Sequence, residues 1–234
     1  MLPATVAWAE AFDDSAPCPL FPAEEAVIAR AVEKRRREFT TGRWCARQAL
    51  AQLGHAPVPI VPGTRGAPTW PLGLVGTITH CTGYRAAVVG RSATVLTVGV
   101  DAEPDDPLPP GVLDAIGLPE ERDWIAERSR AEPKISWGKL LFSAKESVYK
   151  AWYPLTGRWL GFEEARITID ATGDMAGTFT ADLLVDGPVL PQHGPLRGFA
   201  GRWLAQRGLV VTAIVVPADA DRPGSSEPHA GAPA

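Results

Sequence analysis

The order of helical and strand-like patterns, which repeats once along the chain, is the feature that most constrains the fold. In each part, segments with helical periodicity precede short apolar or β-branched runs that are bounded by turn residues. The helical segments are 22–39 and 40–54, then 119–130 and 137–153. The strand-like runs are 75–81, 84–90 and 94–103, then 165–170, 177–186, 197–206 and 208–217. This order predicts an α+β chain of two similar halves, although no repeat is visible at the level of residues.

The expected boundaries follow from the turn-rich segments. Residues 104–118 are rich in proline and indicate a connector, so we expect an N-terminal half at 1–103 and a C-terminal half at 104–217. The tail at 218–234 has no apolar side chain larger than alanine and is predicted to be disordered. The run GRSA at 90–93 predicts a hairpin between the second and third strands.

The composition excludes several classes of protein. A chain of 234 residues with 45% hydrophobic and 21% charged residues is typical of a globular protein. Its net charge of -4 argues against a nucleic-acid partner, and no run is long enough to span a membrane. The three cysteines are widely spaced, and the N-terminus lacks the basic start of a secretion signal. We therefore expect a cytoplasmic protein.

Two acids end the third strand-like run, in the sequence VGVDAEPDD at 98–106. Because side chains alternate in a strand, Asp101 and Glu103 point to the same side, roughly 7 Å apart at Cα. That spacing allows both carboxylates to share one cation. Taken alone, the pair is also compatible with a solvated acidic edge.

The helical segment from 137 has two distinct faces. One face is apolar and is expected to lie in the core; it comprises Trp137, Leu141, Ala144, Val148 and Ala151. The opposite stripe comprises Lys139, Phe142, Ser143, Glu146 and Lys150. Its charges alone are compatible with exposed ion pairs along a helix. Together, Asp101, Glu103 and Glu146 supply the hard oxygen ligands that Mg²⁺ prefers.

Basic residues of the first half could bind phosphate groups on an otherwise acidic protein. They include Arg36, Arg37, Arg43 and Arg47. Arg43 and Arg47 lie one helical turn apart and can converge on one anion, whereas a solvated basic face is the alternative. We expect Lys34 and Arg35 to be solvated. His80 could donate to a phosphate or be a structural group.

These motifs resemble those of the 4′-phosphopantetheinyl transferases of the large, single-chain Sfp type, especially the siderophore and actinobacterial branch. The family pattern G-[VI]-D-x-E matches GVDAE, and W-x-x-K-E-[SA]-x-x-K matches FSAKESVYK with Phe142 at the aromatic position. Further matches are FTTGRWCARQAL, GTRGAPTWP and GTITHCTGY. The motifs span residues 20–160, and the rest of the resemblance rests on element order.

The resemblance implies two pseudo-symmetric halves, each with helices packed on an antiparallel sheet, and coenzyme A in the cleft between them. It implies that Asp101, Glu103 and Glu146 hold Mg²⁺ against the coenzyme pyrophosphate, with Mn²⁺ as an alternative. Lys150 would touch the same phosphates. The residues implied to bind the rest of coenzyme A are Arg43, Arg47, Arg65, Thr79 and His80; Arg65 stands where the family usually has lysine.

The implied reaction transfers the phosphopantetheine arm to a serine of an apo acyl or peptidyl carrier protein and releases adenosine 3′,5′-bisphosphate. Glu146 is the expected general base, Lys150 is expected to stabilise the leaving group, and Asp101 is expected to act through the metal. We expect a monomer whose carrier-docking surface includes Lys145, Tyr149, Trp152 and Tyr153, although Trp152 could equally lie in the core. A Mg²⁺-dependent phosphodiesterase and a non-catalytic coenzyme A- or carrier-binding module are the alternatives.

Overall fold

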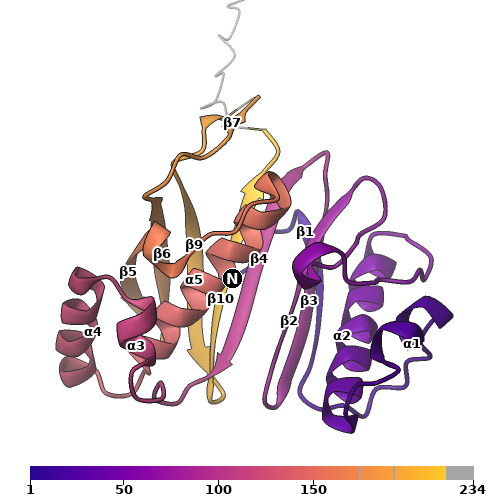
Figure 1. Cartoon of the computed structure of the whole chain (residues 1–234), viewed down its shortest axis with the longest axis horizontal. Coiled ribbons are helices and arrows are strands. Elements are labelled where there is room, and N and C mark those ends of the chain that lie inside the picture. The colour runs from indigo at the N-terminus through magenta and orange to yellow at the C-terminus, as the bar shows by residue number, and fades with distance from the viewer. Residues whose placement is uncertain (174, 192, 220–234) are drawn as a thin grey trace, which may run out of the picture.

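Two large antiparallel sheets, each covered by a long helix, make up most of the described part of the protein. The computed structural model describes residues 1–173, 175–191 and 193–219, so the predicted disorder of the tail falls, from residue 220 onward, outside the described residues. Figure 1 shows the N-terminal sheet with α1 and α2 on one side of the molecule and the C-terminal sheet with α3, α4 and α5 on the other. The prediction of an α+β fold with helices on antiparallel sheets is confirmed.

The N-terminal sheet has the strand order β1-β3-β2. Its elements are β1 (Val6–Ala11), α1 (Pro22–Ile28), α2 (Glu33–Gln52), the 3₁₀ turn η1 (Thr64–Gly66), β2 (Leu74–Cys81) and β3 (Tyr84–Arg91). The apolar side of α2, including Cys45, Ala46, Ala49 and Leu50, packs on this sheet.

The C-terminal sheet has the strand order β4-β10-β9-β6-β5. Its strands are β4 (Val95–Pro104), β5 (Ala165–Gly173), β6 (Ala176–Leu183), β9 (Gly198–Gln206) and β10 (Leu209–Pro217). Its helical elements are α3 (Val112–Ile116), α4 (Pro119–Ala131), α5 (Trp137–Thr156) and η2 (Phe162–Glu164), and β7 (Val189–Leu190) pairs with β8 (Gly194–Pro195). The five residues predicted for the core face of α5 are all buried.

Three sequence-based expectations about the elements were wrong. The predicted helix break near Thr40 lies instead at 29–32, where Arg36 donates to the last carbonyl of α1, at Ile28. Strand β1 was not anticipated. The hairpin joins β2 and β3 through Gly83, whose φ of 75° suits a tight turn, while β4 leaves to pair with β10.

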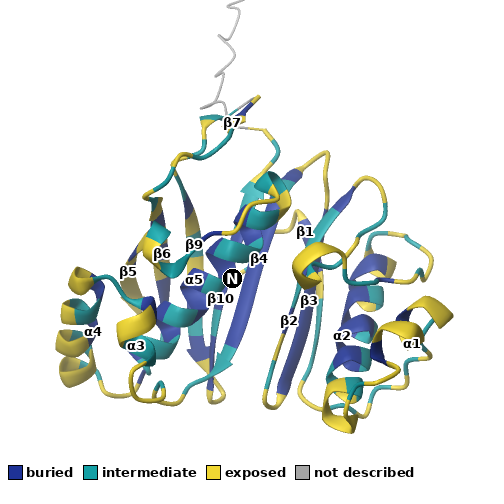
Figure 2. Cartoon of the chain, in the orientation of Figure 1, coloured by how far each residue is buried: buried dark blue, intermediate teal, exposed yellow. Residues whose placement is uncertain are grey.

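Strand β4 connects the two halves. It follows β3 in the chain, yet it is hydrogen-bonded along its whole length to β10 of the C-terminal sheet. Val98 and Val100 of β4 pack against Val88 of β3 in a cluster that joins the two sheets. Figure 2 shows this strand as one of the most continuously buried segments. Both sides of β4 are covered, one by α5 and the other by β3.

The two halves also share a buried ion-pair arrangement. In α1, one oxygen of Glu24 accepts the N–H of Phe21 at 2.9 Å and pairs with Arg47, and the other accepts the N–H of Ile60. In α4, one oxygen of Glu121 likewise accepts the N–H of Leu118 and pairs with Lys145 at 2.8 Å. Its other oxygen accepts the N–H of Ile167. Each glutamate stands three residues after the residue that precedes its helix, and each helix begins with proline. This correspondence supports two related halves.

Within the described residues, no helix is long and apolar enough to cross a membrane. Cys18, Cys45 and Cys81 are free thiols.

Candidate active site

Close packing of α5 on β4 determines where the charged residues of the helix lie. A Cβ atom at Gly99 would come within 2.0 Å of the Ser147 carbonyl oxygen, so only glycine allows the helix to approach this closely. Thr97 Oγ1 of β4 donates to the carbonyl of Ala151 at 2.8 Å. Ser143 on α5 also bonds the hydroxyl of Thr212 on β10 at 2.9 Å. These contacts determine the position of α5 along β4, with Glu146 and Lys150 beside the acidic end of the strand.

Lys150 links the two halves at the centre of the site. Its Nζ lies 2.7 Å from Asp101 Oδ1 and 3.4 Å from Thr79 Oγ1, and it donates to the carbonyl of Val100 at 3.3 Å. Thr79 of β2 in turn donates to Asp101 Oδ1 at 3.2 Å and accepts the N–H of Ala102. The structure therefore brings together Asp101 of the strand motif, Lys150 of the helix motif and Thr79 of the GTITHCTGY segment.

The two glutamates of the site have raised pKa values. Burial, followed by the negative charge of Asp101, raises the pKa of Glu103 to about 6, and Lys139 acts against this shift with its Nζ 3.7 Å from Glu103 Oε2. Burial is also the main cause of the raised pKa of Glu146; the charge of Asp101 adds to it and that of Lys150 opposes it. The three carboxylates thus lie close enough to repel one another. A bound cation would relieve this repulsion.

The acids fit a magnesium ion that is completed by substrate. Within the described part of the chain, no group of three or more His, Cys, Asp or Glu side chains is placed so that it could hold a metal ion by itself. Asp101 Oδ2, however, is buried and has no hydrogen-bond partner among the described residues. Mg²⁺ in phosphate chemistry is commonly held by one or two carboxylates, phosphate oxygens and water. An unsatisfied buried carboxylate oxygen beside two further acids matches that demand.

A basic group lies beside Thr79. Arg35 Nη1 is 2.9 Å from His80 Nε2, and Glu38 Oε2 is 3.7 Å from His80 Nδ1. Partial burial, followed by the charge of Arg35, lowers the pKa of His80. Because arginine only donates, Nε2 is the acceptor and the proton of the neutral ring is on Nδ1. Arg35 is exposed, as expected, and its guanidinium in addition contacts His80, a contact that the sequence analysis did not anticipate.

Arg43 and Arg47 each have partners within the protein. Arg43 is buried, lies 3.5 Å over the ring of Phe39, and donates from Nε to the carbonyl of Ile60 at 3.0 Å. Burial lowers its pKa to about 10, so it stays charged at neutral pH. Arg47 is instead paired with the buried Glu24 and donates to the carbonyl of Pro19 at 3.2 Å. Arg47 therefore has structural partners, and its role in binding coenzyme A stays a prediction.

Arg65 reaches from the N-terminal half toward the C-terminal half. It adopts a positive φ of 57°, and its guanidinium lies 5.3 Å from the ring of Trp159. Both residues line a cavity of about 430 Å³, together with Glu146, Tyr149 and Leu160. The cavity thus adjoins the acidic site and is bordered by aromatic and aliphatic side chains.

The predicted docking surface was wrong in part. Lys145 is buried against Glu121 and donates to the carbonyls of Phe162 and Ala165, so it cannot meet a partner. Trp152 is fully buried, which confirms the alternative that it belongs to the core. Tyr149 and Tyr153 are half-buried, with their ring centroids 5.8 Å apart.

Comparisons with known proteins agree with this geometry. The family model described as "4'-phosphopantetheinyl transferase N-terminal domain" matches residues 23–90, and that of the "4'-phosphopantetheinyl transferase superfamily" matches residues 97–189. The chain is 53% identical to the 4'-phosphopantetheinyl transferase Svp of Streptomyces mobaraensis, over 99% of this chain and 94% of the relative. It is also 53% identical to the 4'-phosphopantetheinyl transferase PptT of Mycobacterium tuberculosis, over 92% and 96%.

A more distant relative is enterobactin synthase component D of Salmonella typhi, which is 37% identical over 58% of this chain and 55% of the relative. One family model ends at residue 90 and the other begins at residue 97, and the alignment with the Streptomyces relative covers both regions. The chain therefore belongs to the 4′-phosphopantetheinyl transferase superfamily.

Proposed function

We propose that this protein transfers the 4′-phosphopantetheine arm of coenzyme A to a serine of an apo acyl or peptidyl carrier protein, giving holo-carrier and adenosine 3′,5′-bisphosphate. The observation that carries the proposal is the Lys150–Asp101–Thr79 contact, which joins the motifs of both halves at one point. The relatives that match nearly the whole chain are 4'-phosphopantetheinyl transferases, which supports a transferase and not a phosphodiesterase or a binding module.

The coenzyme pyrophosphate is proposed to bind where Lys150 meets the acids. Asp101, Glu103 and Glu146 would hold Mg²⁺, or Mn²⁺, which when bound neutralises phosphate charge. Lys150 then stabilises the charge that develops on the departing adenosine 3′,5′-bisphosphate. Arg43 and Arg35, with His80, form the basic group for a further phosphate of the coenzyme. Arg47 stays a candidate for this group, although its guanidinium is paired with Glu24.

Glu146 is the proposed general base. In the reaction, the acceptor serine oxygen bonds to the phosphorus that carries the pantetheine arm, and the bond from that phosphorus to the bridging oxygen breaks. The serine proton passes to Glu146, directly or through a water molecule. A raised pKa makes this carboxylate a stronger base than an ordinary glutamate.

The cavity beside Glu146 is proposed to hold the pantetheine arm. Its aromatic and aliphatic lining, including Tyr149 and Leu160, suits the dimethyl and methylene groups of the arm. Arg65 over Trp159 borders this cavity, so it is a candidate contact for the coenzyme. We further propose that the protein acts as a cytoplasmic monomer on carriers of fatty-acid, polyketide, nonribosomal peptide or siderophore synthesis.

Intact-mass measurement of a panel of apo carrier proteins tests this function. After incubation with the protein, coenzyme A and Mg²⁺, one phosphopantetheine arm should be added at the acceptor serine, and EDTA should prevent the addition. Glu146→Gln, which removes the base and preserves size, should nearly abolish the gain in mass without altering the fold. A panel that stays unmodified while coenzyme A binds measurably would contradict the proposal.

A further inference from the structure

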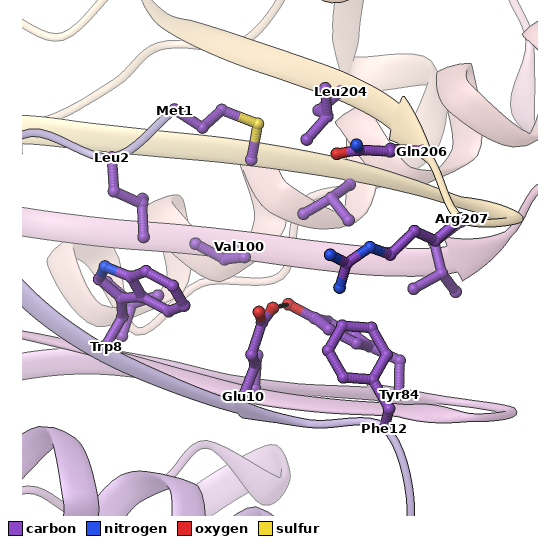
Figure 3. Close-up of a pocket in the computed structure, with 14 residues that line it drawn as sticks. Met1, Leu2, Trp8, Glu10, Phe12, Tyr84, Val100, Leu204, Gln206 and Arg207 are labelled. Carbon is purple, nitrogen blue, oxygen red and sulfur yellow. Dashed lines mark hydrogen bonds between the residues drawn. The ribbon is translucent and has the colours of Figure 1, made fainter. Parts of the chain in front are cut away.

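A second cavity lies between the two sheets, on the side of β4 opposite the candidate active site. It has a volume of about 390 Å³ and is lined by β1, β3, β4, β9 and β10 (Figure 3). Val100 lines it, whereas the next residue, Asp101, points to the active site because side chains alternate along a strand. The cavity is therefore separate from the coenzyme site.

One end of this cavity is apolar and partly open. Figure 3 shows Leu2, Trp8 and Val100 gathered at this end, with Met1 above them. Trp8 is 47% exposed although it is one of the largest apolar side chains of the protein. An exposed indole ring that borders a cavity is more typical of a binding site than of a solvated surface.

The other end carries one negative and one positive side chain. Tyr84 donates its hydroxyl to Glu10 Oε2 at 2.8 Å, and the rings of Tyr84 and Phe12 lie 5.3 Å apart. The guanidinium of Arg207 lies 5.4 Å from the centroid of Phe12. These contacts place Glu10 and Arg207 around the same aromatic pair, as Figure 3 also shows.

Neither charge has an opposite charge as its partner among the described residues. There, Glu10 Oε1 and the guanidinium of the exposed Arg207 have no hydrogen bond and no ion pair. Arg207 stands in the two-residue turn between β9 and β10, and its positive φ of 56° follows from the geometry of such a hairpin turn. An unpaired cation held in this turn over an aromatic ring favours an external anionic group as its partner.

We infer that this cavity binds a free α-amino acid with a large apolar side chain. The α-ammonium group would pair with Glu10 and face the rings of Tyr84 and Phe12, and the α-carboxylate would pair with Arg207. The side chain would lie toward Leu2 and Trp8. A ligand with a single charge would meet one attractive and one repulsive group, whereas a zwitterion satisfies both.

Isothermal titration calorimetry with a charge series on the unmodified protein tests this inference. L-Phenylalanine should bind at least tenfold more tightly than phenethylamine, which lacks the carboxylate, and 3-phenylpropionate, which lacks the ammonium group. Glycine, which lacks the apolar side chain, should not bind measurably. Equal affinity for all three phenyl compounds, or no heat with L-phenylalanine, L-tryptophan and L-leucine at millimolar concentration, would overturn the inference.

Variants locate the site. Glu10→Gln keeps an acceptor for Tyr84 and removes the charge, and Arg207→Gln removes the cation; each should weaken L-phenylalanine binding at least tenfold. Arg130→Gln, on the exposed side of α4, is the matched control and should bind as the unmodified protein does. Leu204→Trp should block binding by filling the cavity while both charges remain.

Unchanged affinity in Glu10→Gln and Arg207→Gln would refute the assignment. These measurements need neither coenzyme A nor a carrier protein, so their outcome is independent of the transferase activity.

Discussion

The ammonium group of Lys150 lies where its charge balances that of the buried Asp101. Asp101 is 4% exposed, and one of its oxygens has Lys150 and Thr79 as partners while the other has none among the described residues. A buried carboxylate with a single cation and a free oxygen can accept a second cation. The local arrangement therefore suits a site that becomes complete only with substrate and metal.

Replacing Lys150 with alanine should lower kcat by about 100-fold or more, because the leaving phosphate loses its cation. It should also lower the free energy of unfolding by about 1–3 kcal/mol, since Asp101 loses a charged partner. Steady-state transfer assays and urea unfolding measure the two effects. Lys134→Ala, at an exposed position before α5, is the control and should change neither; turnover of Lys150→Ala at the full rate would remove the residue from the mechanism.

Glu103 is predicted to make stability depend on pH. Its pKa in the folded protein, about 6, exceeds the ordinary value of 4.5, so the folded state holds this proton more tightly than the unfolded state. The free energy of unfolding should therefore fall as pH rises from 4.5 to about 6, and the whole loss should be present above about pH 6.

In metal-free protein near neutral pH, Glu103→Gln should therefore raise the free energy of unfolding by up to about 2 kcal/mol. The gain should vanish below the ordinary pKa of glutamate. Urea unfolding with EDTA across this pH range measures it, with the exposed Glu127→Gln as control. A gain that is the same at every pH would show that charge at Glu103 is not its cause.

At the scale of elements, the contact between α5 and β4 positions the candidate catalytic residues. Gly99 lies under Ser147 and Ala151, so α5 rests directly on the strand that carries Asp101 and Glu103. The same helix buries its apolar side on the rest of the sheet. Glu146 and Lys150 are therefore held on a rigid element, which suits a site that depends on precise geometry.

Gly99→Ala should force α5 away from β4, because its methyl group would lie 2.0 Å from the Ser147 carbonyl oxygen. We expect a loss of about 3 kcal/mol in the free energy of unfolding and of most transferase activity. Gly173→Ala, where no atom lies within 4 Å of the added carbon, is the matched control. Equal thermal unfolding temperatures for the two variants would contradict the proposed contact.

At the scale of the whole molecule, the two halves are coupled through β4. This strand follows the N-terminal sheet in sequence and pairs with β10, the last strand of the described chain. The expected division at residue 103 stays a prediction, and the strand just before it is part of the C-terminal sheet. Because a cut there would expose the edge of β10, we do not expect the halves to be stable apart.

Differential scanning calorimetry should therefore show one unfolding transition, with equal calorimetric and van 't Hoff enthalpies. Residues 1–103 expressed alone should lack a cooperative unfolding transition, because Val98 and Val100 lose their packing against Ala213 of β10. Two separate transitions in the full chain would show that the halves fold independently.

The sequence by itself determined the features that depend on local geometry. Alternation in a strand placed Asp101 and Glu103 on one side of β4. The helical period separated the apolar side of α5 from its charged side. Both patterns follow from backbone repeats of a few residues. Family motifs identified the candidate site for the same reason, since each motif is a short local pattern.

Only the tertiary structure decided which distant segments meet. It placed β4 in the C-terminal sheet, paired Arg47 with Glu24, brought Arg35 to His80 and buried Lys145. These outcomes depend on contacts between residues far apart in the chain, where burial and charge pairing outweigh local preference. No short pattern in the sequence records such partners, so the partners of individual arginines within the protein followed only from the fold.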